Sequence, residues 1–299
     1  MLSGNLDQLK NIYAKDGRRL FLKINSRVLD GYLEDGHIGE AQKDSMVAHV
    51  INNVIGAYQD DVLTYSSEEQ KIMRRMADDV KAEIKDFTPN NEKLWNLLYP
   101  NWREIISEVT VHLLVGLPKN YDALAIDDEK GNPTIVYDMG NWIIYQNLNV
   151  GDVVQNLLTH ELAHVCNYDT YPKLKEISLM GYLEKLNAIS FDEGFAHLLS
   201  FENKEISSID WQEDRFEKIF RESLDVMKEA LLENDSSKQD EFIEKSMIGN
   251  FHEKFGAMVG MIYLANQWIK HGDSSLKNLF DEGHQIFLDS ILESATNNS

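Results

Sequence analysis

The sequence predicts an α+β fold that is mostly helical, with a small sheet in its middle part. Two observations lead to this class: apolar residues recur at helical spacing near both ends of the 299-residue chain, whereas residues 97 to about 150 are rich in β-branched residues. With 43% apolar residues, a chain of this length can bury a substantial core in one or two domains, and five prolines with no long Ser/Gly-rich tract leave little room for disordered linkers. We expect a helical N-terminal region over residues 1–96, either a subdomain or a lid over a cleft, and a second domain over residues 97–299.

The first region shows helical periodicity without a catalytic constellation. Its apolar positions repeat every three or four residues at Leu9, Ile12, Tyr13, Leu20, Phe21 and Ile24, and again at Val47, Val50, Ile51, Val54 and Ile55. Residues 66–69 (Ser-Ser-Glu-Glu) predict a further helix start, and the Pro-Asn-Asn of residues 89–91 predicts a break. His37 and His49 are isolated, so we expect them at the surface or in the core rather than as metal ligands.

Three short β-rich runs follow in the middle of the chain. They cover residues 109–116, 123–126 and 134–138, with a turn signal at residues 127–133 between the second and the third. These runs predict a small sheet that directly precedes the next helical stretch. Residues 151–299 are predicted to be helical again.

That helical stretch contains an H-E-x-x-H motif at residues 160–164 (His-Glu-Leu-Ala-His). Apolar residues at positions 153, 154, 157, 158, 162 and 165 place the motif in an amphipathic helix, with Asp152 as a predicted N-cap. On a helix His160 and His164 share one face, so both imidazoles can bind one zinc ion. Glu161 can then hold the water that the metal polarises. The alternative is a half-buried helix with two hydrogen-bonded histidines and no metal.

A hydrolytic zinc site needs a third protein ligand and leaves the fourth position to water. Asn167 and Thr170 occupy the positions where the metzincin pattern requires a glycine and a histidine, so that pattern is excluded. Asp169 lies close in sequence but lacks the position and the surroundings of a metzincin ligand. The remaining option is a glutamate from a later helix, and Glu193 within residues 189–197 is the candidate.

Residues 192–196 (Asp-Glu-Gly-Phe-Ala) resemble the (N/D)-E-G-F-A helix of gluzincin metallopeptidases, notably the aminopeptidase N-like family and compact peptidase MA-like domains. The resemblance covers two short motifs and one weaker region, far from the whole chain. It implies a thermolysin-like zincin core within residues 97–299, in which Glu193 joins His160 and His164 as the third zinc ligand. A different interpretation needs no metal: Ser190 and Glu193 would form a capping box at a helix start.

The weaker region is residues 250–256, near the place where the aminopeptidase N-like family has a Y-x-K-G segment whose tyrosine stabilises the oxyanion. In this chain the tyrosine is missing and the register is offset by one residue. Thermolysin-like gluzincins use a histidine in this role, so the resemblance implies that His252 takes it. The alternative for His252 is an ordinary histidine at a helix end, and Tyr263 is expected to pack in the core.

Substrate binding is expected to differ from that of the family's aminopeptidases. Those enzymes carry a G-x-M-E-N segment that anchors the free amine of the substrate, whereas residues 137–142 of this chain contain no glutamate. An endopeptidase is therefore favoured over an aminopeptidase. Because an edge strand in this place commonly pairs with an extended substrate in zinc peptidases, we expect residues 134–142 to form that strand.

Several neighbours of the motifs are candidates for supporting roles. Asp192 and Asp169 are both candidates to accept the ring N–H of a metal-bound histidine. His197 lies one turn after Glu193, so it is predicted either to act at the site, towards substrate or metal, or to pack in the core. Cys166 is expected to be a small buried residue that points away from the metal.

Net charge and amino-acid composition exclude some classes of binding partner and favour one cell compartment. Lys and Arg number 29 against 50 Asp and Glu, a net charge of −21, which argues against nucleic acid or anionic lipid. The sequence has neither an apolar run long enough to span a membrane nor a secretion signal at its start. With Cys166 as its one cysteine we expect a cytoplasmic protein, although a secreted protein whose leader has been removed would look the same. The oligomeric state is not predicted.

These observations predict zinc-dependent hydrolysis of a peptide or protein substrate, with Glu161 activating a zinc-bound water. The alternative is a catalytically inactive zincin-fold protein that acts through binding or regulation. The irregular Y-x-K-G region favours this alternative, whereas the intact Glu161 speaks against it, since a chain without turnover has no physical need for that base.

Overall fold

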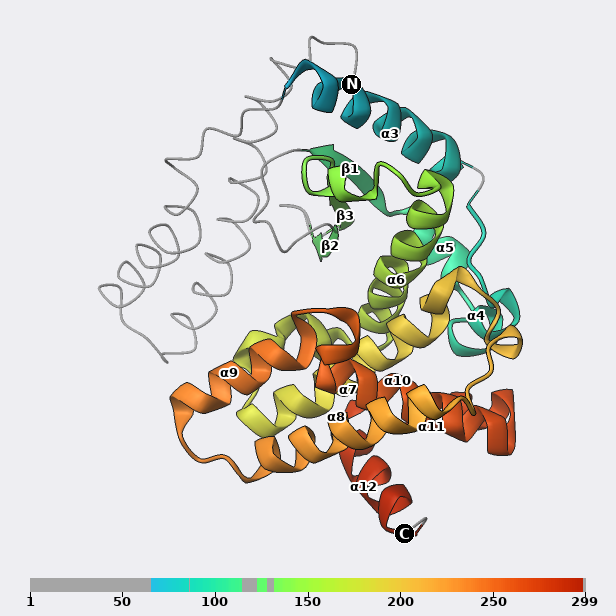
Figure 1. Ribbon diagram of the computed structural model, residues 1–299. Helices are drawn as coiled ribbons and strands as arrows, with labels where there is room; N and C mark the ends of the chain where they lie inside the picture. Colours follow the sequence, from blue (N-terminus) through green and yellow to red (C-terminus); the bar gives the residue numbers. More distant parts are fainter. Residues whose placement is uncertain (1–65, 86, 115–122, 128–131, 298–299) are drawn as a thin grey trace. The chain divides into compact units, whose positions relative to one another are not determined.

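A computed structural model describes residues 66–85, 87–114, 123–127 and 132–297 of the chain. The described part is mostly helical and contains one small sheet, which confirms the α+β class (Figure 1). The predicted helices over residues 9–24 and 47–55, with His37 and His49, lie outside the described residues.

The chain divides into two compact units. The first unit takes residues 1–87 and 108–154, and the second takes residues 88–107 and 155–299. The predicted domain boundary after residue 96 falls inside a helix, α4 (Glu92–Leu98), which belongs to the second unit.

In the first unit, α3 (Ser67–Lys85) begins where residues 66–69 predict a helix start. The Ser66 Oγ accepts a hydrogen bond from the Glu69 backbone N–H at 3.2 Å, and the Glu69 carboxylate accepts one from the Ser66 backbone N–H at 2.7 Å. This reciprocal pair is a capping box, which satisfies two N–H groups that the helix itself leaves unpaired. The buried stripe of the helix consists of Met73, Met76, Ala77 and Val80.

The sheet consists of β1 (Thr110–Leu114), β2 (Ala123–Asp127) and β3 (Pro133–Asp138), as the three β-rich runs predict. Its order is β1-β3-β2, with β3 parallel to β1 and antiparallel to β2. The prediction that residues 134–142 form an edge strand is therefore wrong. Both edges of β3 are hydrogen-bonded to neighbouring strands, and residues 141–145 form a 3-10 helix, η3 (Asn141–Tyr145).

The second unit is built from helices. Its elements are α4 (Glu92–Leu98), α5 (Trp102–Ser107), the larger part of α6 (Val150–Thr170), η4 (Pro172–Leu179), α7 (Tyr182–Ser200), η5 (Phe201–Asn203), η6 (Ile206–Ser208), α8 (Asp214–Leu232), α9 (Ser236–Met247), η7 (Phe251–Glu253), α10 (Phe255–His271), α11 (Asp273–Glu282), η8 (His284–Ile286) and α12 (Phe287–Asn297). The helices α7 and α10 pack extensively on each other, and most of their side chains are buried. These two helices form the centre of the unit's core.

The helix α6 begins two residues earlier than its predicted N-cap. Asp152 lies in the first turn, and the side chain of Asn149 accepts a hydrogen bond from the Gly151 backbone N–H at 3.1 Å. The prediction of Asp152 as the N-cap is wrong because the capping side chain, Asn149, lies three positions before it, at the actual start of the helix.

Glycines allow α7 and α10 to approach closely. A Cβ on Gly260 would lie 2.0 Å from the carbonyl oxygen of Ser190, and a Cβ on Gly194 would lie 3.0 Å from the backbone of Gly260. At 2.0 Å the atoms overlap, so the observed crossing requires glycine at position 260, whereas a side chain at position 194 would force the backbone of α10 to give by a few tenths of an ångström. Gly194 directly follows Glu193, and the crossing therefore fixes the segment that carries this carboxylate.

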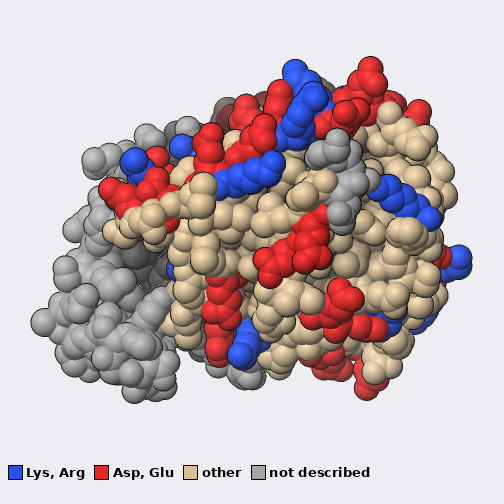
Figure 2. All heavy atoms as spheres, turned by 90° about the horizontal axis from the view of Figure 1, so that it is seen from below, with Lys and Arg blue, Asp and Glu red and all other residues tan. Residues whose placement is uncertain are grey.

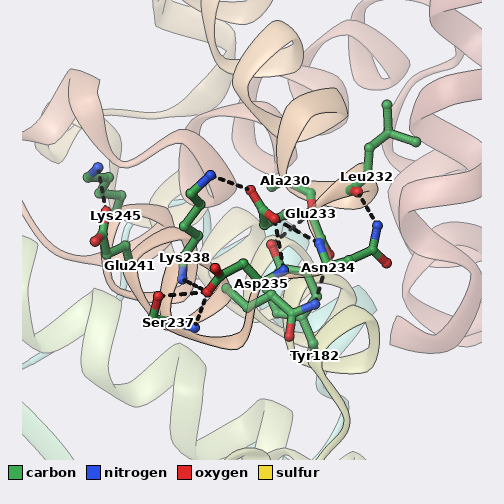
Figure 3. Close-up of polar contacts among 11 residues, drawn as sticks. Tyr182, Ala230, Leu232, Glu233, Asn234, Asp235, Ser237, Lys238, Glu241 and Lys245 are labelled. Carbon is green, nitrogen blue, oxygen red and sulfur yellow. Dashed lines mark hydrogen bonds and ion pairs between the residues drawn. The ribbon is translucent and has the colours of Figure 1, made fainter.

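The helices α8 and α9 are joined by a short polar link, shown in Figure 3. Asp235 is the N-cap of α9, and its carboxylate accepts hydrogen bonds from the backbone N–H groups of Ser237 at 2.9 Å and Lys238 at 3.5 Å. The hydroxyl of Tyr182, at the start of α7, donates to the Ala230 carbonyl near the end of α8 at 2.9 Å. This contact joins the start of α7 to the end of α8. Tyr182 precedes Glu193 on α7 by three turns of helix.

The face shown in Figure 2 carries Asp and Glu side chains interspersed with Lys and Arg. Broad basic patches are not seen there among the described residues. None of the described helices combines the length and the apolar character that crossing a bilayer demands.

Candidate metal centre

Three side chains from two helices of the second unit converge on one point. His160 and His164 lie on α6 and Glu193 lies on α7. The Nε2 atoms of the two histidines are 3.1 Å apart, and the Glu193 carboxylate lies 3.6 Å from the His160 Nε2 and 3.8 Å from the His164 Nε2. The ligand atoms of all three residues lie within 4.8 Å of one another, so the cluster could hold a metal ion.

The helix positions explain this convergence. His160 and His164 are separated by four residues, and this spacing places both rings on one face of α6. Ser190 and Glu193 lie inside α7, eight and eleven residues after its start, so the interpretation of these two residues as a capping box at a helix start is wrong. Glu193 is instead free of a capping role and directs its carboxylate at the two histidines.

The rings of both histidines are held from their far sides. His164 Nδ1 lies 3.0 Å from the Asp192 carboxylate, although its N–H does not point straight at the oxygen. His160 has a hydrogen bond to the backbone of Ala196. Of the two candidate partners that the sequence offers, Asp192 is buried beside His164, whereas Asp169 is exposed. With Nδ1 turned to Asp192 in this way, the Nε2 of His164 faces the cluster.

Burial and charge act differently on the two histidines. Burial lowers the pKa of His160 well below its usual range, and the neighbouring His197, His164 and Lys254 act in the same direction. Burial also opposes protonation of His164, but the carboxylates of Asp192 and Glu193 outweigh it and raise its pKa to about 10. Without a metal the cluster therefore carries its proton on His164, and a metal ion must displace that proton on binding.

Glu161 lies directly beside the cluster and is buried, with 7% of its surface exposed. Its negative charge contributes to the raised pKa of His164. Burial raises the pKa of Glu193, the other glutamate of the site, and the positive charge of His164 opposes this effect. The charges of two carboxylates from different helices therefore act on His164, Glu161 from α6 and Glu193 from α7.

His197 lies beside the cluster. Its Nε2 is 3.4 Å from the Glu193 carboxylate, and its ring centroid is 4.4 Å from that of His160. The ring also packs edge-on against Phe251 at 5.0 Å. Burial, with the positive charges of Lys254 and His164, lowers the pKa of His197 well below its usual range, so the ring is neutral. Of the two predicted roles for His197, this position favours the one at the site.

The 250–256 segment meets the site through Phe251 and Lys254. His252 is exposed, and its ring contacts the neighbouring Phe251 at a centroid distance of 5.2 Å. The positive charge of Lys254, which precedes α10, acts on His160, Glu193 and His197. The oxyanion role of His252 stays a prediction. The sequence interpretation overlooked Lys254, although it lies in the same segment.

Two further expectations about buried residues are confirmed. Cys166 is fully buried, and Tyr263 packs in the core with 4% of its surface exposed. Cys166 follows His164 by two positions, and this spacing on a helix directs the two side chains to different faces.

The donor set is chemically coherent for a divalent cation. Two imidazole nitrogens and one carboxylate are three ligands, which leaves one position of a tetrahedral centre open for water or substrate. The two Nε2 atoms face each other at 3.1 Å, and the rings are oriented from behind by Asp192 and by the Ala196 backbone. In the metal-free protein the proton on His164 lies between these two Nε2 atoms, and a bound cation would take its place. No protein-family model, curated protein or solved structure matches this chain, so its candidate centre is known from its own residues.

Proposed function

We propose that the protein is a zinc-dependent peptidase. The observation that carries the proposal is the convergence of His160, His164 and Glu193 within 4.8 Å, with Glu161 next to the first histidine. Zinc suits two nitrogens and one carboxylate oxygen, and three protein ligands with one open position are typical of catalytic rather than structural zinc sites. The resemblance of residues 160–164 and 192–196 to the gluzincin motifs supports the same assignment. The proposal includes a thermolysin-like core around these two motifs.

Zinc held by His160, His164 and Glu193 would supply a Lewis acid that lowers the pKa of water from about 15.7 towards 7. Glu161 accepts the proton of the attacking water and passes it to the leaving amine. The His164–Asp192 contact holds the imidazole so that its Nε2 keeps facing the cluster. His252 is the residue that the family resemblance offers for the oxyanion, and Lys254, whose positive charge acts on His160 and Glu193, is a second candidate.

The substrate is a peptide or protein cleaved within the chain rather than at its amino end. This choice rests on residues 137–142, which lack a glutamate that could bind a free ammonium group. The central position of β3 removes one way of binding an extended substrate, because a strand paired on both sides has no free backbone hydrogen bonds to offer.

The test uses the full chain and compares wild type with Glu161→Gln on casein and on a mixed library of fluorogenic peptides. Removal of the base should lower turnover by about 100-fold or more while the bound metal stays. Glu229→Gln on the exposed face of α8 is the matched control and should leave turnover unchanged. Chelation should abolish turnover, and added zinc should restore it. Full activity of Glu161→Gln would refute the assignment of the base.

The alternative, a binding or regulatory protein that retains the metal, has a different signature. In that case Glu161→Gln, wild type and chelated protein would show the same background hydrolysis, while metal binding would persist. The exposed His252, which contacts Phe251, is the observation that favours this alternative.

A further inference from the structure

A buried chain of polar contacts leads from the metal cluster to a distant part of the sequence. The Tyr99 hydroxyl donates to the Asn167 side-chain oxygen at 2.7 Å, and the Asn167 amide nitrogen donates to the Asp192 carboxylate at 2.7 Å. The other oxygen of Asp192 lies 3.0 Å from His164 Nδ1. Tyr99, Asn167, Asp192 and His164 are exposed by 2%, 0%, 7% and 6%, so water does not compete for these contacts.

Chemistry sets the direction of every hydrogen bond in this chain. An ionised carboxylate accepts only, so Asn167 must turn its NH2 group towards Asp192. Its carbonyl oxygen is thereby left to face Tyr99, where the phenol supplies the one proton that this oxygen needs. Asp192 thus sets which way the amide of Asn167 points, and the Tyr99 hydroxyl anchors the other end of that amide, so that Asn167 is held between the two.

Aromatic neighbours hold Tyr99 in this position. Its ring packs edge-on against Trp95 and against Phe280, at a centroid distance of 5.2 Å in each case. Burial raises the pKa of Tyr99 well above its usual range, with a smaller contribution from Cys166, so the phenol keeps its proton. Tyr99 follows α4, and residues 88–107 belong to the same compact unit as the metal cluster, although residues 108–159 separate the two in the sequence.

We infer that Tyr99 and Asn167 are positioning residues of the metal centre, which hold Asp192 so that the Nε2 of His164 stays directed at the ion. This inference rests on the metal site of the proposed function. It gives residues 88–107 a part in that site. It also predicts that removing the Tyr99 hydroxyl weakens metal binding, although Asn167, Asp192 and His164 stand between this hydroxyl and the metal.

The expected effects are graded along the chain. Groups that hold a metal-bound histidine typically change metal affinity by about 10- to 100-fold when they are removed, and we expect this range for Asp192→Asn. Tyr99→Phe leaves the ring and its packing in place but deprives the buried Asn167 oxygen of its donor, so that the amide keeps only one of its two anchors, the contact with Asp192. Acting through two further contacts, it should weaken zinc binding by about three- to tenfold.

The experiment measures zinc affinity of the full chain by competition with a chromophoric chelator, and the absorption spectrum of the cobalt(II) form. The variants are Tyr99→Phe, Asp192→Asn and the double variant. The matched control is Tyr182→Phe, which also removes a tyrosine hydroxyl bound to a buried partner, the Ala230 carbonyl, away from the metal cluster (Figure 3). If Tyr99 acts through Asp192, Tyr99→Phe should have no further effect in the Asp192→Asn background.

The outcomes distinguish a role of Tyr99 in positioning the metal ligand His164 from a general contribution of its hydroxyl to protein stability. Weaker binding and a shifted cobalt spectrum in Tyr99→Phe, unchanged values in Tyr182→Phe and non-additive effects in the double variant are the expected result. Unchanged affinity in Tyr99→Phe, or additive effects in the double variant, would overturn the inference while leaving the zinc site intact. Absence of zinc binding in wild type would instead overturn the proposed function, and the inference with it. If Tyr99→Phe and Asp192→Asn show the expected non-additive effects on zinc affinity but the wild type hydrolyses no peptide, only the proposed peptidase activity would be refuted.

Discussion

The closest approach between α7 and α10 offers a sharp test of the fold that carries the cluster. In Gly260→Ala the new Cβ would lie 2.0 Å from the Ser190 carbonyl oxygen, 3.0 Å from the Ser190 carbonyl carbon and 3.1 Å from the Gly194 Cα. These atoms belong to helix backbone, which cannot rotate away as a side chain can. The two helices must therefore separate by about 1 Å to reach ordinary contact distances.

The magnitude follows from two opposing effects. Overpacking of a buried contact destabilises by about 1–3 kcal/mol and occasionally more, and a backbone clash of this depth lies at the upper end. Alanine gains about 1 kcal/mol over glycine in helix propensity, which offsets part of the loss. We expect a net destabilisation of about 2 kcal/mol, equivalent to a lower Tm by about 4–8 °C. Gly194 adjoins Glu193, so the same substitution should also weaken zinc binding.

The assay is thermal unfolding of full-length protein followed by circular dichroism, with and without zinc. Gly181→Ala is the matched control, because no atom lies within 4 Å of its new Cβ and its backbone is extended with φ of −65°. As the N-cap of α7 it should lose less than about 1 kcal/mol. A Tm for Gly260→Ala equal to or above that of Gly181→Ala would refute the close crossing.

Two further predictions concern buried groups. His284 is 1% exposed, and burial lowers its pKa despite the opposing charges of Glu184 and Asp192, with Lys173 acting in the same direction as burial. The native protein thus keeps this ring neutral, and its stability should fall as pH drops below about 6.5, where the unfolded chain takes up the proton. A thermal-unfolding series from pH 8 to pH 5 should show a smaller loss in His284→Phe, and parallel curves for both proteins would contradict this. Cys166 is fully buried, so its thiol should react with a disulfide reagent only after unfolding; rapid reaction of the native protein would show that α6 is misplaced.

Local patterns in the sequence predicted those features that depend on neighbouring residues. The spacing of His160 and His164 needs only a helix to bring the rings together, and residues 66–69 carry both partners of their capping box. The three β-runs were likewise recognisable from composition. Their order was not, because pairing in the sheet joins β1 directly to β3, and nothing local tells a central strand from an edge strand.

The supporting residues of the centre were harder to predict because their contacts are distant in sequence. The Tyr99–Asn167 contact spans 68 residues and the Asn167–Asp192 contact spans 25. Asn167 itself served in the sequence interpretation only to exclude a metzincin pattern, and Tyr99 carried no motif. Glu193 could be proposed because Gly194, Phe195 and Ala196 follow it. The structure adds a physical reason for this glycine, which is the close crossing with α10.

The metal content of protein purified without added metal or chelator tests the central claim most directly. Plasma mass spectrometry of wild type beside His164→Ala should find about one zinc per wild-type chain, as three ligands around one point predict, and almost none in the variant. Absence of metal from wild type, with no rise in Tm on adding zinc, would contradict the claim. Residues 160–164 and Glu193 would then be a buried polar cluster without a bound ion.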